Sequence, residues 1–153
     1  MPIQLSAVGL ASAALLVAAL VSLISTPVVR SLAFRVGAVD IPKDARRMHD
    51  HPIPRMGGLA IFFGFILSVL IFQPLTPELR GMLLGAVVIV ILGILDDISS
   101  LPALPKFFVQ IGAALIAVLH GNCIEFLSNP NIFSSEPFWE LGWLSIPITV
   151  FWI

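Results

Sequence analysis

Residues 81–100 read GMLLGAVVIVILGILDDISS, and this stretch decides the fold class of the chain. Fifteen uncharged and mostly aliphatic residues, 81–95, separate Arg80 from the pair Asp96-Asp97. Apolar runs of this kind are typical of helices that cross a membrane, whose hydrocarbon layer is about 30 Å thick. Because such a run makes only about 22 Å of helix, we expect the two aspartates to lie below the headgroups, beside water or a cation.

The composition of the whole chain agrees with a membrane protein. Of 153 residues, 58% are hydrophobic and 11% are charged, and the formal net charge is -1. Average proteins have about 45–50% apolar and about 25% charged residues. This balance excludes a nucleic-acid-binding domain, which needs a basic surface, and a disordered chain, which needs low hydrophobicity. Cys123 is the only cysteine, so an internal disulfide framework is also excluded.

Four further uncharged stretches accompany the first, at residues 5–29, 56–77, 107–119 and 141–153. They predict an all-α, polytopic membrane helix bundle with four complete transmembrane helices and the start of a fifth. Residues 1–153 are then the N-terminal part of one integral-membrane domain. Between the last two stretches, the turn signal Asn129-Pro130 predicts a small hairpin at about 123–142.

The basic residues predict an orientation in the cell membrane. Seven of the eight lie in the connections 30–55 and 96–106, whereas the opposite connections carry only Arg80. Basic residues in short loops favour the cytoplasmic side. We therefore expect loops 30–55 and 96–106 in the cytoplasm, and the N-terminus and residues 120–140 outside.

The acidic pair is the first candidate site. Carboxylates at a membrane helix are costly, so Asp96 and Asp97 are candidates for function, although they can also simply end the helix at the interface. Neighbouring residues of a helix do not face each other, so the two carboxylates are expected to have different roles. Carboxylate oxygens suit Mg²⁺, which takes one or two of them together with substrate phosphates.

The loop DIPKDARRMHDHPIPRMGG, residues 40–58, is the second candidate site. Its bases are either membrane anchors or donors to an anionic ligand, and glycines at the start of the next helix allow close approach of a phosphate. Lys106 is likewise an anchor or a phosphate contact. Gly81 and Gly85 have the GxxxG spacing of packed membrane helices, which also allows a homodimer.

Two stretches resemble one enzyme family. The first contains Asp40-x-Pro42, Arg46, His49, Pro52 and Gly57-Gly58, and the second is GILDDISSLPALPKFFVQ, residues 93–110. In order, spacing and membrane placement they resemble the bacterial glycosyltransferase family 4, the polyprenyl-phosphate N-acetylhexosamine-1-phosphate transferases. The resemblance implies a multi-pass membrane enzyme that uses Mg²⁺, with Mn²⁺ as an alternative.

The resemblance also implies a reaction. N-acetylglucosamine-1-phosphate would pass from UDP-N-acetylglucosamine to undecaprenyl phosphate, with release of UMP, at the start of a cell-envelope polymer such as teichoic acid or O-antigen. The sister branch, which uses UDP-N-acetylmuramoyl-pentapeptide for peptidoglycan, is the alternative. The implied partners are undecaprenyl phosphate, a UDP-N-acetylhexosamine and the lipid bilayer.

Residue roles are carried over position by position. Asp96 is expected to act as base and Asp97 to contact substrate or metal. The expected substrate-binding residues are Arg46, His49, Arg55, Gly57, Gly58 and Lys106. The family's main metal ligand is expected beyond Ile153, so we expect this chain alone to be inactive.

Two other classes compete with the enzyme. A transporter would also carry acids in its spans, but nearer the bilayer midplane and with an inverted repeat, which the sequence lacks. A non-catalytic membrane scaffold would use the GxxxG face and would need neither the acidic pair nor the basic loop.

Overall fold

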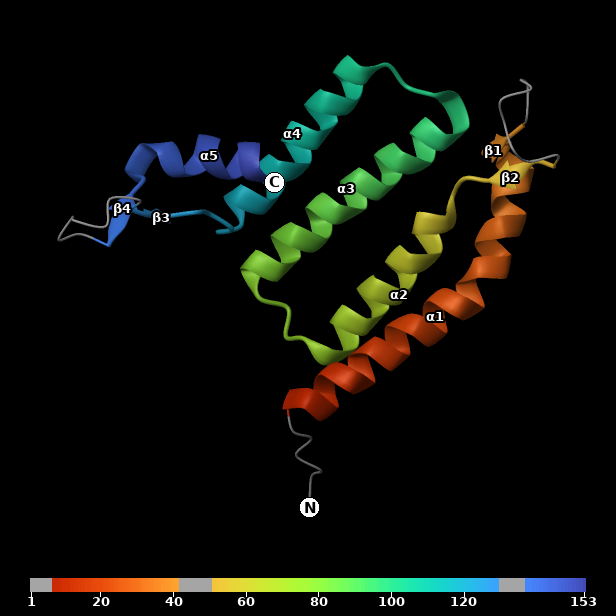
Figure 1. Cartoon of the computed structure of the whole chain (residues 1–153), viewed down its shortest axis with the longest axis horizontal. Coiled ribbons are helices and arrows are strands. Elements are labelled where there is room, and N and C mark those ends of the chain that lie inside the picture. The colour runs from red at the N-terminus through yellow and green to blue at the C-terminus, as the bar shows by residue number, and fades with distance from the viewer. Residues whose placement is uncertain (1–6, 42–50, 130–136) are drawn as a thin grey trace. The chain divides into compact units, whose positions relative to one another are not determined.

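The structure is a computed structural model that describes residues 7–41, 51–129 and 137–153. Most of these residues are helical (Figure 1). The chain divides into two compact units, residues 1–75 with 90–101, and residues 76–89 with 102–153. Arg46 and His49, two of the expected substrate-binding residues, lie outside the described residues.

Two helices lying side by side form most of the first unit: α1, Ala7–Val36, and α2, Gly57–Phe72 (Figure 1). Small residues bring them close, since a Cβ atom added at Gly64 would stand 2.3 Å from the carbonyl oxygen of Ala18. One helical turn away, the Ser68 hydroxyl donates to the carbonyl oxygen of Ala14 at 2.8 Å. This is how membrane helices pack when lipid supplies no hydrophobic drive between them.

The connection between α1 and α2 begins with a left-handed cap. Gly37 follows α1 with φ +76°, and the N–H of Ala38 donates to the carbonyl of Ala33 at 2.9 Å, the long bond of a Schellman motif. Strand β1, Val39–Asp40, then pairs antiparallel with β2, Ile53–Pro54. The strand pair closes the base of the loop that the sequence singles out at 40–58.

Helix α3, Pro77–Ser99, belongs to both units, and its residues 77–89 pair in the second unit with α4, Ala103–Leu119. A Cβ atom at Gly81 would lie 2.3 Å from Cβ of His120, and one at Gly85 would lie 2.9 Å from the carbonyl oxygen of Ala113. The GxxxG spacing therefore serves packing inside one chain. The homodimer stays a prediction.

The predicted hairpin is present. Strand β3, Phe126–Ser128, pairs antiparallel with β4, Phe138–Glu140, and is followed by a short 3-10 turn, Gly142–Leu144, and by α5, Ser145–Trp152. The buried Thr149 ties α5 to the residues before the hairpin, because its hydroxyl accepts from the N–H of Ile124 at 2.8 Å.

Helix lengths confirm the membrane class in part. Helices α1 and α3 are long and apolar enough to cross a membrane. Of the most apolar 18 residues of each helix, 0% are buried in α1 and 17% in α3. Helices α2 and α4, with 16 and 17 residues, are shorter than the usual span of about 20, so the count of four spans is not confirmed. The uncharged stretch 81–95 is the middle of a longer helix. Helix α3 has 23 residues, about 34 Å, because its hydrogen-bonding continues through polar residues at both ends, and the depth of the aspartates in a membrane stays a prediction.

Candidate functional site

The acidic pair lies inside the last turn of α3. The helix continues past Asp96 and Asp97 to Ser99, and its last turn contains no basic residue. Negative charge is unfavourable there, because the partial charge of a helix C-terminus is itself negative, an effect of about 0.3–1 kcal/mol per charge. The negative charges of the two acids are therefore unfavourable for the helix.

Asp97 faces an arginine from the loop 40–58. The Nε atom of Arg55 lies 3.9 Å from Oδ1 of Asp97, and the two side chains are 48% and 28% exposed. This separation is too long for a hydrogen bond, and an exposed ion pair adds little stability. Both groups are therefore open to a ligand, and the structure brings together two motifs that are distant in the sequence.

A small buried cluster holds these two residues in place. It consists of Val29, Ala33, Ala38, Met56 and Ala60, and Leu59 and Ile94 pack against it. Met56 directly follows Arg55, whose backbone N–H donates to the carbonyl of Ala38 at 3.0 Å. Ile94 lies within one turn of Asp97. The cluster thus positions both the start of α2 and the end of α3.

The start of α2 is open. Cβ atoms added at Gly57 and Gly58 would meet no described atom within 4 Å, so packing among the described residues does not require glycine there. No described side chain caps this helix, although the Leu59 N–H donates to the Met56 carbonyl at 3.0 Å. The predicted close approach of a ligand to the two glycines is compatible with this space and stays a prediction.

Asp96 has a different environment from Asp97. Its Oδ1 atom accepts the backbone N–H of Leu101 at 2.8 Å, just beyond the end of α3. The alternative in which the acids end the helix therefore has support for Asp96. Its expected role as base stays a prediction.

Lys106 and the metal site complete the predicted set. Lys106 lies in the first turn of α4, in the unit that does not contain the acidic pair, and its role stays a prediction. Within the described ranges, no three or more His, Cys, Asp or Glu side chains gather as a metal site. Mg²⁺ needs only one or two carboxylates alongside phosphates, and the partly exposed Asp97 has the oxygen donors that suit it.

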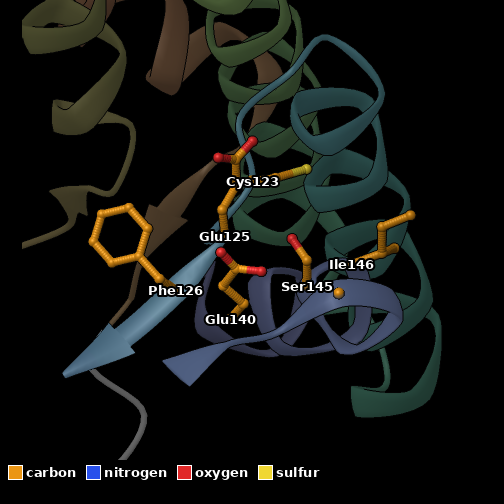
Figure 2. A pocket seen from close by; sticks show the side chains of 7 residues that line it. Cys123, Glu125, Phe126, Glu140, Ser145 and Ile146 are labelled. Carbon is orange, nitrogen blue, oxygen red and sulfur yellow. The ribbon is translucent and has the colours of Figure 1, made fainter. Parts of the chain in front are cut away.

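The second unit contains a hollow that the sequence analysis does not predict. Figure 2 shows Glu125 and Glu140, from the hairpin segment, and Ser145, at the start of α5, around this space. Its lining residues are Cys123, Glu125, Phe126, Glu140, Gly142, Ser145 and Ile146. Two carboxylates and no base would repel phosphates, so the hollow does not compete with Arg55 for an anionic ligand.

Comparison with known proteins agrees with the resemblance drawn from the two motifs. Residues 79–153 match the family model described as glycosyl transferase family 4. The chain belongs to this family, and the recognition from sequence is confirmed. It is 45% identical over 141 residues to the "probable undecaprenyl-phosphate N-acetylglucosaminyl 1-phosphate transferase" of Bacillus subtilis (strain 168), covering 92% of this chain.

Two further relatives have related names. A decaprenyl-phosphate N-acetylglucosaminephosphotransferase of Mycobacterium tuberculosis is 40% identical over 69% of this chain, and the match covers 28% of the length of that relative. An undecaprenyl-phosphate alpha-N-acetylglucosaminyl 1-phosphate transferase of Yersinia pestis is 36% identical over 60% of this chain, and the match covers 25% of the length of that relative. The chain spans 38% of the length of the Bacillus subtilis relative. No solved structure matches this chain significantly.

Proposed function

We propose that this chain takes part in the transfer of N-acetylglucosamine-1-phosphate from UDP-N-acetylglucosamine to undecaprenyl phosphate, with release of UMP. The observation that carries the proposal is the approach of Arg55 to Asp97, 3.9 Å apart. It joins a base suited to phosphate with a carboxylate suited to a cation, in a chain of glycosyl transferase family 4. The start of cell-envelope polymer synthesis is the proposed role of the reaction.

The names of the relatives support the choice of sugar. All three name N-acetylglucosamine and a polyprenyl phosphate, and none names a muramoyl pentapeptide. We therefore favour UDP-N-acetylglucosamine as donor and undecaprenyl phosphate as acceptor.

The roles of the residues follow from the chemistry of phosphoryl transfer. The acceptor phosphate attacks the β-phosphorus of the UDP-sugar and UMP leaves, while negative charge develops on phosphate oxygens. The guanidinium of Arg55 would hold these oxygens with its planar fork of donors. Asp97 would hold a Mg²⁺ ion, which supplies positive charge for the phosphates when bound. A phosphate monoester loses its second proton near pH 6, so the acceptor needs little help from a base at neutral pH.

The membrane orientation is part of the proposal. We infer that loops 30–55 and 96–106 face the cytoplasm, where UDP-sugars are made, because they carry seven of the eight bases. Position 44 lies in the first of these loops. Labelling of a cysteine there from the outside, in protein without Cys123, would contradict this orientation.

The function is tested with protein expressed from its own gene, including any sequence that follows residue 153 in the reading frame. Purified protein is given UDP-N-acetylglucosamine, undecaprenyl phosphate and Mg²⁺, and UMP is measured. We expect UMP release that requires both substrates and stops when EDTA is added.

A parallel reaction uses UDP-N-acetylmuramoyl-pentapeptide as donor. We expect no UMP from it, because the proposed site serves the smaller hexosamine donor. UMP release with the pentapeptide donor alone would overturn the choice of sugar. No UMP with either donor, in protein that is folded and complete, would overturn the proposed activity.

A further inference from the structure

A residue with positive φ lies within two residues of the end of three helices. Gly37 directly follows α1 with φ +76°, Ser100 directly follows α3 with φ +45°, and Gly121 lies two residues after α4 with φ +98°. Ser100 is the one non-glycine residue with positive φ among the residues that the structure describes. Glycine adopts this conformation freely, whereas a side chain makes it costly. Such outliers persist only where their surroundings hold them.

A side chain provides the hold at Ser100. After α1, the N–H that follows the left-handed residue, that of Ala38, donates to the backbone carbonyl of Ala33, five residues back. After α3, the equivalent N–H, that of Leu101, donates to the side-chain Oδ1 of Asp96, also five residues back, at 2.8 Å. The N–H of Ser100 donates to the backbone carbonyl of the same Asp96 at 2.8 Å. Asp96 therefore closes the turn with both its backbone and its side chain.

We propose that Asp96 and Ser100 are positioning residues that act through Asp97. The last turn of a helix lacks some backbone bonds and frays unless a cap holds it. Asp97 is in this last turn, so closure of the turn at Ser100 keeps its carboxylate opposite Arg55. The link to activity rests on the proposed transferase function, whereas the link to the turn does not.

The chemistry of this cap makes a specific distinction. The bond from the Leu101 N–H requires an acceptor oxygen at position 96, and this bond does not require a negative charge. Asparagine supplies such an oxygen and alanine does not. In addition, glycine at position 100 removes the cost of the left-handed conformation, so the turn depends less on Asp96.

The turn itself is tested by hydrogen exchange of the purified protein in detergent, followed in peptides that cover residues 99–104. We expect Asp96→Ala to speed the exchange of the Leu101 amide and Asp96→Asn to leave it protected. Adding Ser100→Gly to Asp96→Ala should slow the exchange again, whereas the neighbouring control Ser99→Gly should not. Equal protection in the wild type and in Asp96→Ala would overturn the proposal, whether or not the protein has transferase activity.

UMP release then tests the link to catalysis. Asp96→Ala should be at least about tenfold slower than Asp96→Asn. Adding Ser100→Gly to Asp96→Ala should raise the rate of UMP release at least about threefold above that of Asp96→Ala alone. Adding Ser99→Gly to Asp96→Ala should not raise it. If Asp96→Asn is as inactive as Asp96→Ala and Ser100→Gly does not restore activity, Asp96 acts as the base and the positioning role is wrong. If wild-type protein releases no UMP, the proposed function fails and hydrogen exchange alone decides on the turn.

Discussion

The ends of α1 and α3 differ in a way that separates helix stability from function. The last turn of α1 contains a base, Arg35, and glycine follows it in the left-handed conformation. Both features favour a helix C-terminus. The last turn of α3 contains two acids and no base, and a serine follows it. The negative charges and the left-handed serine cost stability, which is common where residues are kept for chemistry, and the bond from the Leu101 N–H to the Asp96 side chain offsets part of this cost.

The two ends also use different acceptors for the same bond. A backbone carbonyl accepts after α1, and a carboxylate accepts after α3. A backbone acceptor is present whatever the side chain is, so the bond that closes the first cap does not depend on which residue is at position 33. The second cap depends on the residue at position 96. The comparison therefore predicts where substitutions affect activity and where they affect only the stability of the fold.

The largest expected effect is that of Asp97→Asn. This variant keeps the shape of the side chain but removes the charge that faces Arg55, and we expect UMP release to fall at least about tenfold, or ~1.4 kcal/mol of transition-state stabilisation. The folded fraction in detergent should not change, because an exposed ion pair adds little stability. A Mg²⁺ titration should show a higher requirement, as expected for a carboxylate that holds the ion.

Glu140→Gln is the matched control, since it removes a carboxylate from the hairpin of the second unit. It should leave turnover unchanged. Equal turnover in wild type and Asp97→Asn at saturating Mg²⁺ would remove Asp97 from the mechanism.

A smaller effect is expected for Arg55→Gln. Loss of one charged donor to phosphate is worth about 1.5 kcal/mol, so KM for the UDP-sugar should rise about tenfold with a smaller change in kcat. Arg55→Lys should recover only part of the affinity, because an ammonium group lacks the planar fork. The control is Arg35→Gln at the end of α1, which should leave KM unchanged. An equal rise in KM for Arg55→Gln and Arg35→Gln would show that the two arginines act only through their positive charge and not through a direct contact with phosphate.

The smallest effects concern stability and have opposite signs at the two helix ends. Gly37→Ala should lower the free energy of unfolding by about 1 kcal/mol, because alanine resists a φ of +76° and meets no atom within 4 Å that could compensate. Ser100→Gly should raise it by less than about 1 kcal/mol, since the relief at φ +45° is partly offset by the freedom of glycine in the unfolded chain. Thermal unfolding in detergent measures both. A loss of stability in Ser100→Gly would contradict the comparison.

Local sequence patterns predicted most of the helices and the hairpin. The apolar stretches anticipated helices α1 to α5, and Asn129-Pro130 anticipated the hairpin, because hydropathy and turn chemistry act over short distances. The ends of the helices were less predictable. Helix α1 continues seven residues beyond the uncharged stretch 5–29, to Val36, since a helix needs backbone bonds rather than apolar side chains once it leaves the hydrocarbon.

Contacts between distant residues required the tertiary structure. The GxxxG spacing indicated packing, but not that His120 and Ala113 of the same chain fill the space beside Gly81 and Gly85. The close approach at Gly64 lies in the small-xxx-small spacing of Ala60, Gly64 and Ser68, a signal that was not used to predict it. Which surface a glycine meets depends on the rotation and offset of two helices, and these are properties of the packed pair.

The sequence by itself determined that this is a membrane protein of glycosyl transferase family 4 with an acidic pair at the end of one helix. Only the tertiary structure decided that Asp97 faces Arg55 while Asp96 closes the turn at Ser100. The two aspartates are adjacent and chemically identical, so no local pattern distinguishes them. Adjacent residues on a helix point about 100° apart, and the packing around the helix therefore gives each carboxylate a different partner.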